Sequence, residues 1–406
     1  MQFFLRLLPA HNLLALPTIR WVILSRFCTN LFFYSTTIVL FQHQRGLNFT
    51  AMFLMESILS GAIWLADVPT SIWADRFSYR RIIILGCVFN LIGMLCFALS
   101  YGFWMFAVAN VLGGFSIACN SGSESALMYN SLATEAREKQ GNSAFALLGT
   151  ASTGGLFLGL TTGSFIGAYS PTLAVIMSIV PLACSLVFAW RIPEQPTLHT
   201  APPELAHVSI EKIIRIALQS IHQQPRLIGL TIFNSAAFVL INAIFWFNQL
   251  YFIRAGIPII LFGPIMSVAV GLQFLMVSRI NLFLQRLGAR VMLMITCFLP
   301  GIAYLLLMRT MQPFLTAGLV VCVVAFSGWR DPLVSDQLNQ NIPDASRATT
   351  LSALSLIGSC TGVIANPWIG SLGDQGLMIT GLGMGTCLIL LCTLLPFVVK
   401  KSMHDK

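Results

Sequence analysis

Long apolar runs, separated by short polar breaks, fill almost the whole chain. A helix needs about 20 mostly apolar residues to cross a bilayer, so each run is a candidate membrane span. Twelve runs qualify: 19–41, 51–74, 82–100, 103–131, 143–168, 171–190, 227–252, 259–281, 290–308, 313–336, 347–371 and 377–399. The pattern therefore predicts an all-α membrane protein with twelve transmembrane helices.

The stretch 191–226 is longer than the other connections and is rich in proline. It divides the chain into an expected N-terminal six-helix bundle at 1–190, a cytoplasmic linker at 191–226 and a C-terminal six-helix bundle at 227–406. Within the linker, residues 204–222 combine apolar residues at helical spacing with charges of both signs. This pattern predicts an amphipathic helix on the membrane surface, with a plain soluble linker helix as an equal alternative.

The arginines and lysines fix the expected orientation. With the N-terminus inside, cytoplasmic segments hold 17 of the 23 basic residues, and the outer loops hold only Arg45, Arg254 and Arg309. Because basic residues concentrate on the cytoplasmic side of membrane proteins, we expect both termini in the cytoplasm. The protein is accordingly expected to be a multi-pass protein of the inner (cytoplasmic) membrane.

Composition excludes several functional classes. Only 9% of the residues are charged and 56% are hydrophobic, whereas soluble domains carry roughly 25% charged residues. The net charge of +9 follows from membrane topology, so no nucleic-acid partner is predicted. The chain has neither a GxxxxGK[ST] nor an HExxH motif. We therefore expect no metal, no cofactor and no enzymatic activity.

A short repeat links the two expected bundles. Residues 76–80 (RFSYR) follow span two, and residues 286–290 (RLGAR) follow span eight, at an offset of 210 positions. Because paired repeats are typical of transporters, the match predicts two pseudo-symmetric halves.

Residues 67–81 read DVPTSIWADRFSYRR. This segment resembles motif A of the major facilitator superfamily, in the branch that reads E-x-P-T-G-x-x-A-D-x-x-G-R-R. Residues 124–132, and Asn339 followed by residues 347–352 (RATTLS), resemble the same drug-efflux-like bacterial branch. The resemblance covers nearly the whole chain and implies the major facilitator fold, in which two six-helix bundles rock about a central cavity. Ser71 and Ser78 stand where that branch has glycines; since serine is small, we expect close packing to be preserved.

The resemblance also implies a cytoplasmic gate. Asp75 ends span two beside three arginines, and an acid there can pair with them and face the positive N-terminus of a partner helix. By resemblance, that partner is span eleven. The expected gate consists of Asp67, Asp75, Arg76, Arg80 and Arg81. The alternative is that these arginines only fix topology.

Charges inside the spans are few, and such charges usually face protein or water and mark function. Arg26 lies in span one and Glu124 in span four, and the resemblance places spans one, four, seven and ten around the cavity. We therefore predict that Arg26 and Glu124 face each other and that Glu124 is the leading proton or substrate site. A static ion pair that fixes helix packing is the alternative.

Other polar residues in the spans are candidates for the cavity or for proton coupling: Glu56, Arg330, Asn30, Asn234 and Gln249. Glu56 either accepts protons or is a solvated helix-end residue. Arg330 either pairs locally with Asp331 or reaches the cavity. Trp246 and Trp329 either stack on a flat substrate or pack.

Span five carries glycines at every fourth position, namely Gly155, Gly159, Gly163 and Gly167. Small residues at this spacing permit close helix contact, and we expect the contacting helix to belong to the opposite half.

Together these features predict a monomeric secondary active transporter that exports a small organic solute using protons, with alternating access across the lipid bilayer. Because Asp75, Glu124 and Glu56 all lie in the first half, we expect gating and coupling to be concentrated in residues 1–190. An importer of a nutrient or metal chelate is the alternative within transport. A non-transporting membrane sensor is the alternative of a different class, although the sequence has no sizeable soluble segment to act as its sensing domain.

Overall fold

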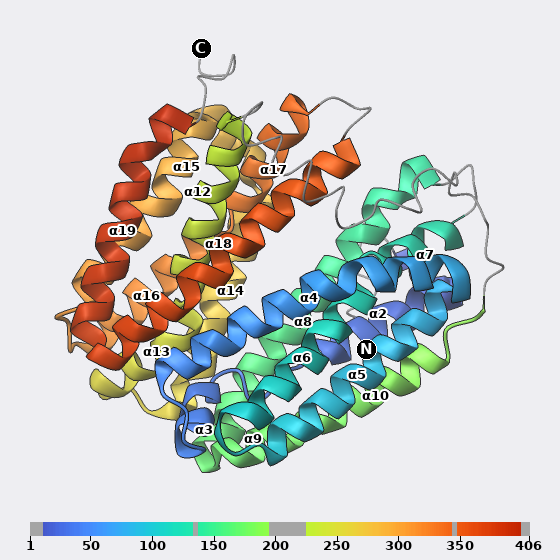
Figure 1. Ribbon diagram of the computed structural model, residues 1–406, viewed down its shortest axis with the longest axis horizontal. Coiled ribbons are helices and arrows are strands. Elements are labelled where there is room, and N and C mark those ends of the chain that lie inside the picture. The colour runs from blue at the N-terminus through green and yellow to red at the C-terminus, as the bar shows by residue number, and fades with distance from the viewer. Residues whose placement is uncertain (1–10, 133–136, 195–224, 343–346, 399–406) are drawn as a thin grey trace. The chain divides into compact units, whose positions relative to one another are not determined.

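The computed structural model describes residues 11–132, 137–194, 225–342 and 347–398, and every element in these ranges is a helix (Figure 1). The first half contains η1 (His11–Ala15), α2 (Pro17–Thr29), α3 (Ile38–Gln44), α4 (Phe49–Phe77), α5 (Tyr79–Leu99), α6 (Gly102–Asn120), α7 (Ser123–Ser131), α8 (Arg137–Tyr169), α9 (Pro171–Met177) and α10 (Ile179–Trp190). The second half contains α12 (Pro225–Asn242), α13 (Ile244–Arg254), η3 (Ile259–Leu261), α14 (Phe262–Ser278), α15 (Ile280–Leu307), α16 (Pro313–Ser327), α17 (Arg330–Asn341), α18 (Arg347–Gln375) and α19 (Leu377–Val398). The expected linker helix at 204–222 lies outside the described residues.

Ten helical segments of the described chain are long and apolar enough to cross a membrane. Each coincides with one of the expected spans. The two expected spans without a counterpart among the ten are 19–41, which divides into the short helices α2 and α3, and 347–371, which lies within the polar-rich α18. The all-helical class is therefore confirmed, and the count of twelve stays a prediction.

Contacts between helices divide the chain into two compact units. Unit 1 comprises Met1–Thr37 and Gly61–Ala206, and unit 2 comprises Ile38–Ser60 and His207–Lys406. The segment 38–60 comes from the first half of the sequence and yet packs with unit 2. Helix α4 consequently begins in unit 2 and enters unit 1 at Gly61.

In unit 1, the glycine stripe of α8 faces span one. A Cβ placed on Gly159 would lie 2.8 Å from the backbone nitrogen of Phe32, and one on Gly167 would lie 2.7 Å from the Thr37 side chain. The sequence-based expectation of a partner in the opposite half was wrong. The small residues instead admit the non-helical backbone that joins α2 to α3, which has no regular ridge of side chains to interlock.

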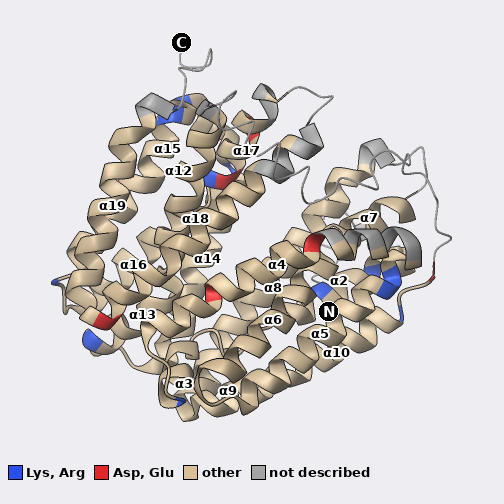
Figure 2. Ribbon diagram, viewed as in Figure 1, with Lys and Arg blue, Asp and Glu red and all other residues tan. Residues whose placement is uncertain are grey.

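In unit 2, α15 packs along α16 and α19, and α12 packs along α18 (Figure 1). Glycines again set the closest approach, since a Cβ on Gly385 of α19 would lie 2.8 Å from the carbonyl oxygen of Gly301 in α15. The hydroxyl of the fully buried Tyr304 donates to the carbonyl oxygen of Leu240 at 3.0 Å and ties α15 to α12. Charged residues are sparse along the drawn helices (Figure 2).

The two repeat segments share an unusual backbone conformation. Ser78, between α4 and α5, has φ +107° and ψ +134°, and Gly288, the matching position inside α15, has φ +76° and ψ +154°. Ser78 is the only non-glycine residue with positive φ in the described ranges. The glycine of the family motif is therefore replaced at a position where backbone conformation, and not only close packing, favours glycine.

Replacing Ser78 with glycine should stabilise the protein. Relief of the strained backbone is worth about 1–3 kcal/mol, and the extra chain entropy of glycine offsets about 0.5–1 kcal/mol of that. We expect Ser78→Gly to raise the thermal unfolding midpoint in detergent and Gly288→Ser to lower it. Ser121→Gly is the control, because Ser121 is exposed and has φ −59°. An unchanged or lower midpoint for Ser78→Gly would contradict this account.

Candidate functional site

A break in span four positions Glu124. Helix α6 ends at Asn120, and α7 begins at Ser123 after Gly122 turns the chain with φ +74°. Glu124 lies in the first turn of α7, where an acid interacts favourably with the positive end of the helix. Its exposed fraction is only 6%.

Arg26 on α2 and Glu124 pair inside unit 1. Arg26 Nη1 lies 3.4 Å from Glu124 Oε2, and Arg26 Nε donates to Ser152 Oγ on α8 at 2.8 Å. An apolar cluster that includes Val22, Ile83 and Leu127 packs around these helices. The prediction that Arg26 and Glu124 face each other is confirmed, and the role of the pair stays a prediction.

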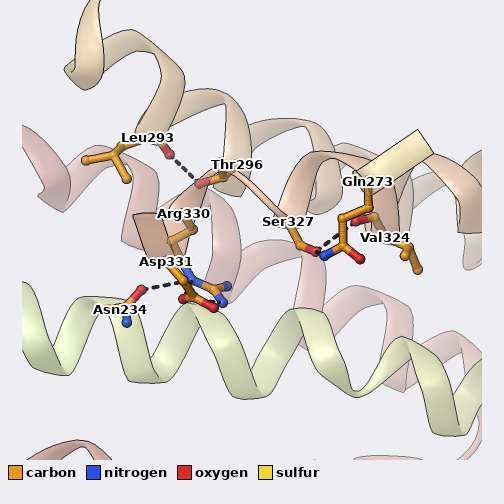
Figure 3. Close-up of polar contacts among 8 residues, drawn as sticks. All are labelled: Asn234, Gln273, Leu293, Thr296, Val324, Ser327, Arg330 and Asp331. Carbon is orange, nitrogen blue, oxygen red and sulfur yellow. Dashed lines mark hydrogen bonds and ion pairs between the residues drawn. The ribbon is translucent and has the colours of Figure 1, made fainter. Parts of the chain in front are cut away.

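A second polar group occupies unit 2, where α16 gives way to α17. Arg330 Nε donates to Asn234 Oδ1 of α12 at 2.9 Å, and Arg330 Nη2 lies 3.1 Å from Asp331 Oδ1 (Figure 3). The Arg330 side chain is 2% exposed, whereas the Asp331 side chain is 58% exposed. The local pair of Arg330 with Asp331 therefore forms, and Arg330 also borders the smaller cavity described below.

The two polar groups occupy equivalent places in the repeat. Arg26 and Asn234 are 208 positions apart, and Glu124 and Asp331 are 207 positions apart. Both acids lie in the first turn of the helix that follows the break, α7 or α17. The partner arginine differs, because it comes from span one in unit 1 and from span ten itself in unit 2. The two groups are therefore similar in position and different in charge arrangement.

A cavity of about 490 Å³ lies within unit 2. Helices α4, α12, α13, α17 and α18 contribute its wall. The wall includes the aromatic residues Phe53, Phe238 and Trp246 and the amides of Asn234, Asn242 and Asn366, together with several serines. Flat aromatic faces and hydrogen-bonding groups suit a ligand that has both a ring and polar substituents.

The charges on the cavity wall are acidic. Glu56 and Asp331 line it, and no Lys, Arg or His is among its described lining residues. Asp331 is paired with Arg330, whereas no side chain in the described part of the chain pairs with the Glu56 carboxylate. Glu56 lies two turns into α4, so the alternative of a helix-end residue does not describe its position. The cavity thus presents one carboxylate without a described counterion.

A smaller cavity of about 70 Å³ adjoins this wall and shares Phe238, Asn242 and Asp331 with it. Arg330 and Gln273 line it, and Gln273 Nε2 donates to Ser327 Oγ at 3.0 Å (Figure 3). Arg330 Nη1 is buried and has no hydrogen-bond partner in the described structure. A ligand acceptor or a water at this place would satisfy it.

Three other residues that the sequence proposed for the cavity, namely Gln249, Asn30 and Trp329, line neither described cavity. Gln249 is fully buried, and its Oε1 accepts hydrogen bonds from the backbone N–H groups of Val39 and Leu40 at 3.2 and 3.4 Å. Its carboxamide oxygen therefore binds the start of α3, and neither described cavity has it among its lining residues. Asn30 ends α2 and donates to the Arg26 carbonyl at 2.8 Å. Trp329 packs on Phe283 and donates to the Met276 carbonyl.

The predicted gate residues are described in part. Asp67 is exposed on α4, and the side chains of Asp75 and Arg76 lie outside the described residues. Arg80 donates to the Trp190 carbonyl at 2.9 Å, and Arg81 lies 3.2 Å from Glu194 Oε1. Glu194 is a partner that the sequence reasoning missed.

Sequence reasoning also missed several cavity residues. Asn242, Asn366, Ser235 and Ser359 line the larger cavity. The two asparagines interrupt apolar runs, and this signal was available in the sequence. The serines gave no signal, because serine is ordinary in membrane helices and often satisfies its hydroxyl within its own helix.

Residues 21–367 match the family model of the Major Facilitator Superfamily. No curated protein sequence matches the chain significantly. Solved structures of nucleoside and peptide transporters are among those similar in fold. A point mutant of the nucleoside transporter NupG gives a TM-score of 0.81 at 14% identity, covering 95% of this chain and 100% of that one.

The peptide transporter POT in complex with sulfate gives a TM-score of 0.73 at 13% identity, covering 93% of each chain. A POT family transporter in complex with 5-aminolevulinic acid gives 0.71 at 13% identity, covering 94% of this chain and 96% of that one. At such identities the likeness establishes the fold alone. Since the family model matches most of the chain, this multi-pass membrane protein belongs to the major facilitator superfamily and is a transporter rather than an enzyme.

Proposed function

We propose that this chain is a proton-coupled secondary transporter for a small polar organic solute that carries a flat ring and is neutral or cationic. The observation that carries the proposal is the cavity of unit 2, with its aromatic faces, its amides and hydroxyls, and a Glu56 carboxylate that has no described counterion. In the larger cavity an anionic solute would meet two carboxylates and no basic group among the described lining residues, since Arg330 lines only the smaller cavity and is paired with Asp331. The named nucleoside transporter of similar fold makes nucleosides the first class to test.

Alternating access by a monomer in the bilayer is the proposed mechanism. The resemblance to motif A supports a cytoplasmic gate at Asp67, Asp75, Arg76, Arg80 and Arg81. The solute would enter the cavity from one side and leave from the other, with Glu124 or Glu56 carrying the proton.

Export remains the leading direction, because it is what the drug-efflux-like motifs imply. Import of a nutrient or metal chelate is the second candidate, because the lining of the cavity suits transport in either direction. A comparison of internal solutes between deletion cells and complemented cells separates them: higher levels in the deletion support export, and lower levels support import. Equal levels across a broad panel would support neither direction and would leave the membrane sensor as an alternative.

Glu124→Gln should uncouple transport from protons. We expect solute counterflow in liposomes to persist while accumulation driven by a pH gradient falls about tenfold or more, since a proton relay within the membrane needs a titratable group. The variant leaves Arg26 without its acid, and because the Arg26 side chain is 34% exposed and partly solvated, the loss of stability should be smaller than for a fully buried pair; the folded fraction must be measured alongside.

The exchanged pair Arg26→Glu with Glu124→Arg is the matched control. If the pair serves packing alone, this double variant should recover proton-driven accumulation together with stability. Full activity with normal pH dependence in Glu124→Gln would remove Glu124 from the mechanism.

Glu56→Gln should reduce selectivity for charge. Because a carboxylate attracts a nearby cation, we expect the variant to bind cationic competitors about tenfold more weakly, equivalent to about 1.4 kcal/mol. Neutral competitors should bind as before. Asp336→Asn is the control, since Asp336 is exposed and is not among the described lining residues of the cavity. Equal losses for neutral and cationic competitors would contradict the assigned role.

A further inference from the structure

Basic residues gather at the end of unit 1 where α2 and α5 begin and α10 ends (Figure 2). Four arginines of the described chain lie there: Arg20, Arg80, Arg81 and Arg191. The candidate span Tyr79–Leu99 starts beside two of them, and the candidate span Pro171–Trp190 ends directly before the last. Because phospholipid headgroups lie at the ends of membrane spans, these side chains are placed at headgroup depth.

Two of the arginines share one acid. Arg80 Nη1 lies 3.7 Å from Glu194 Oε2, and Arg81 Nη2 lies 3.2 Å from Glu194 Oε1. Arg80 Nη2 also donates to the carbonyl oxygen of Trp190 at 2.9 Å. The carboxylate of Glu194 is therefore already used by α5 and balances only part of the positive charge at this end of the unit.

The other two arginines gather around one aromatic ring. The guanidinium carbons of Arg20 and Arg191 lie 5.0 and 5.4 Å from the centroid of the Trp21 ring, within the range of a cation–π interaction. Both arginines are exposed, and no acid in the described part of the chain forms an ion pair with either. Since two like charges repel each other, an anion that approaches both of them is favoured.

Trp21 is held in place by apolar neighbours. Its ring stacks on Phe188 of α10, with centroids 5.8 Å apart and an interplanar angle of 26°. It also packs against the apolar cluster that includes the buried residues Ile19 and Ala189. The ring that the two guanidinium groups contact is thus fixed before any ligand arrives, which reduces the conformational freedom that is lost on binding.

An apolar stripe on α10 leads up to Arg191. Val180, Cys184, Val187 and Arg191 follow one another at helical spacing, so they share one face of the helix. Val180 and Val187 are 56% and 50% exposed, and Cys184 is exposed as well. Trp190 is 66% exposed beside this stripe, and tryptophan is enriched where membrane spans meet water. An acyl chain that lay along the stripe would bring its headgroup to the arginines.

We propose that Arg20, Arg191 and Trp21 form a binding site for the headgroup of an anionic phospholipid, whose acyl chain lies along the exposed face of α10. The phosphodiester supplies the negative oxygens that guanidinium groups bind well, and anionic lipids attract basic residues at the membrane surface. In the expected topology the site belongs to the cytoplasmic leaflet. The proposal depends neither on the identity of the solute nor on the direction of transport.

Native mass spectrometry of the purified protein, titrated with phosphatidylglycerol in detergent, tests the site. Arg20→Gln with Arg191→Gln should weaken retention of this lipid by about tenfold or more, because each basic residue at an anionic membrane surface contributes to binding. Phosphatidylcholine should be retained equally by the variant and the unmodified protein. Arg279→Gln with Arg286→Gln is the matched control, since it removes the same charge from two exposed arginines at the beginning of α15.

Two results would overturn the proposal. Equal losses of phosphatidylglycerol in both double variants would reduce the effect to net charge. Unchanged retention in the Arg20 and Arg191 variant, with or without a change in the thermal unfolding midpoint, would mean that these arginines serve contacts within the chain.

Quenching of tryptophan fluorescence locates the bound lipid. Phosphatidylglycerol with brominated acyl chains should quench the unmodified protein more strongly than brominated phosphatidylcholine does. This difference should shrink in Trp21→Phe and disappear in Arg20→Gln with Arg191→Gln. Excess inorganic phosphate should not restore the fluorescence, because it lacks the acyl chain that follows α10. Equal quenching by the two lipids, or full restoration by phosphate, would contradict a site for an anionic phospholipid.

Discussion

The free-energy cost of placing a charge inside a membrane-spanning helix constrains this structure more than any other interaction. Each such charge must find a partner or face water, and the chain meets this requirement differently in its two units. In unit 1, Arg26 and Glu124 neutralise each other within an apolar cluster. In unit 2, Arg330 is neutralised by the neighbouring Asp331, whose carboxylate also borders the cavity. Glu56 lines the same cavity and has no described counterion.

Because the two units neutralise their charges differently, a repeated arrangement of helices does not require the two units to have the same function. The breaks in spans four and ten place an acid in the first turn of α7 and of α17, so the scaffold repeats. The cavity of unit 2 has the larger set of amides and aromatic rings, whereas the described polar group of unit 1 is a compact ion pair with Ser152. The sequence places the candidate gating and coupling residues mainly in residues 1–190, yet Asp331 and Asn234, which line the larger cavity, lie in the second half.

The sequence predicted the helices well because hydrophobic run length reports directly on membrane spans. It also predicted the Arg26–Glu124 pair, because the family resemblance places spans one and four around one cavity and charges within the spans are rare. It did not foresee the partners of Gln249 or of the glycines of α8, because a polar or small residue in a span does not reveal which neighbouring segment it meets. Ser78 shows a third kind of limit: its residue type suggested packing, while its backbone φ of +107° gives the physical reason for the family's glycine.

The central claim is that a ring-bearing, neutral or cationic solute moves together with protons through this chain. The most direct measurement follows internal pH in liposomes that contain the purified protein, while nucleosides and matched cationic and anionic ring compounds are added outside. The account predicts proton movement on addition of a neutral or cationic ring compound and none with the anionic counterparts. Proton movement triggered only by anions, or by none of the compounds, would contradict it.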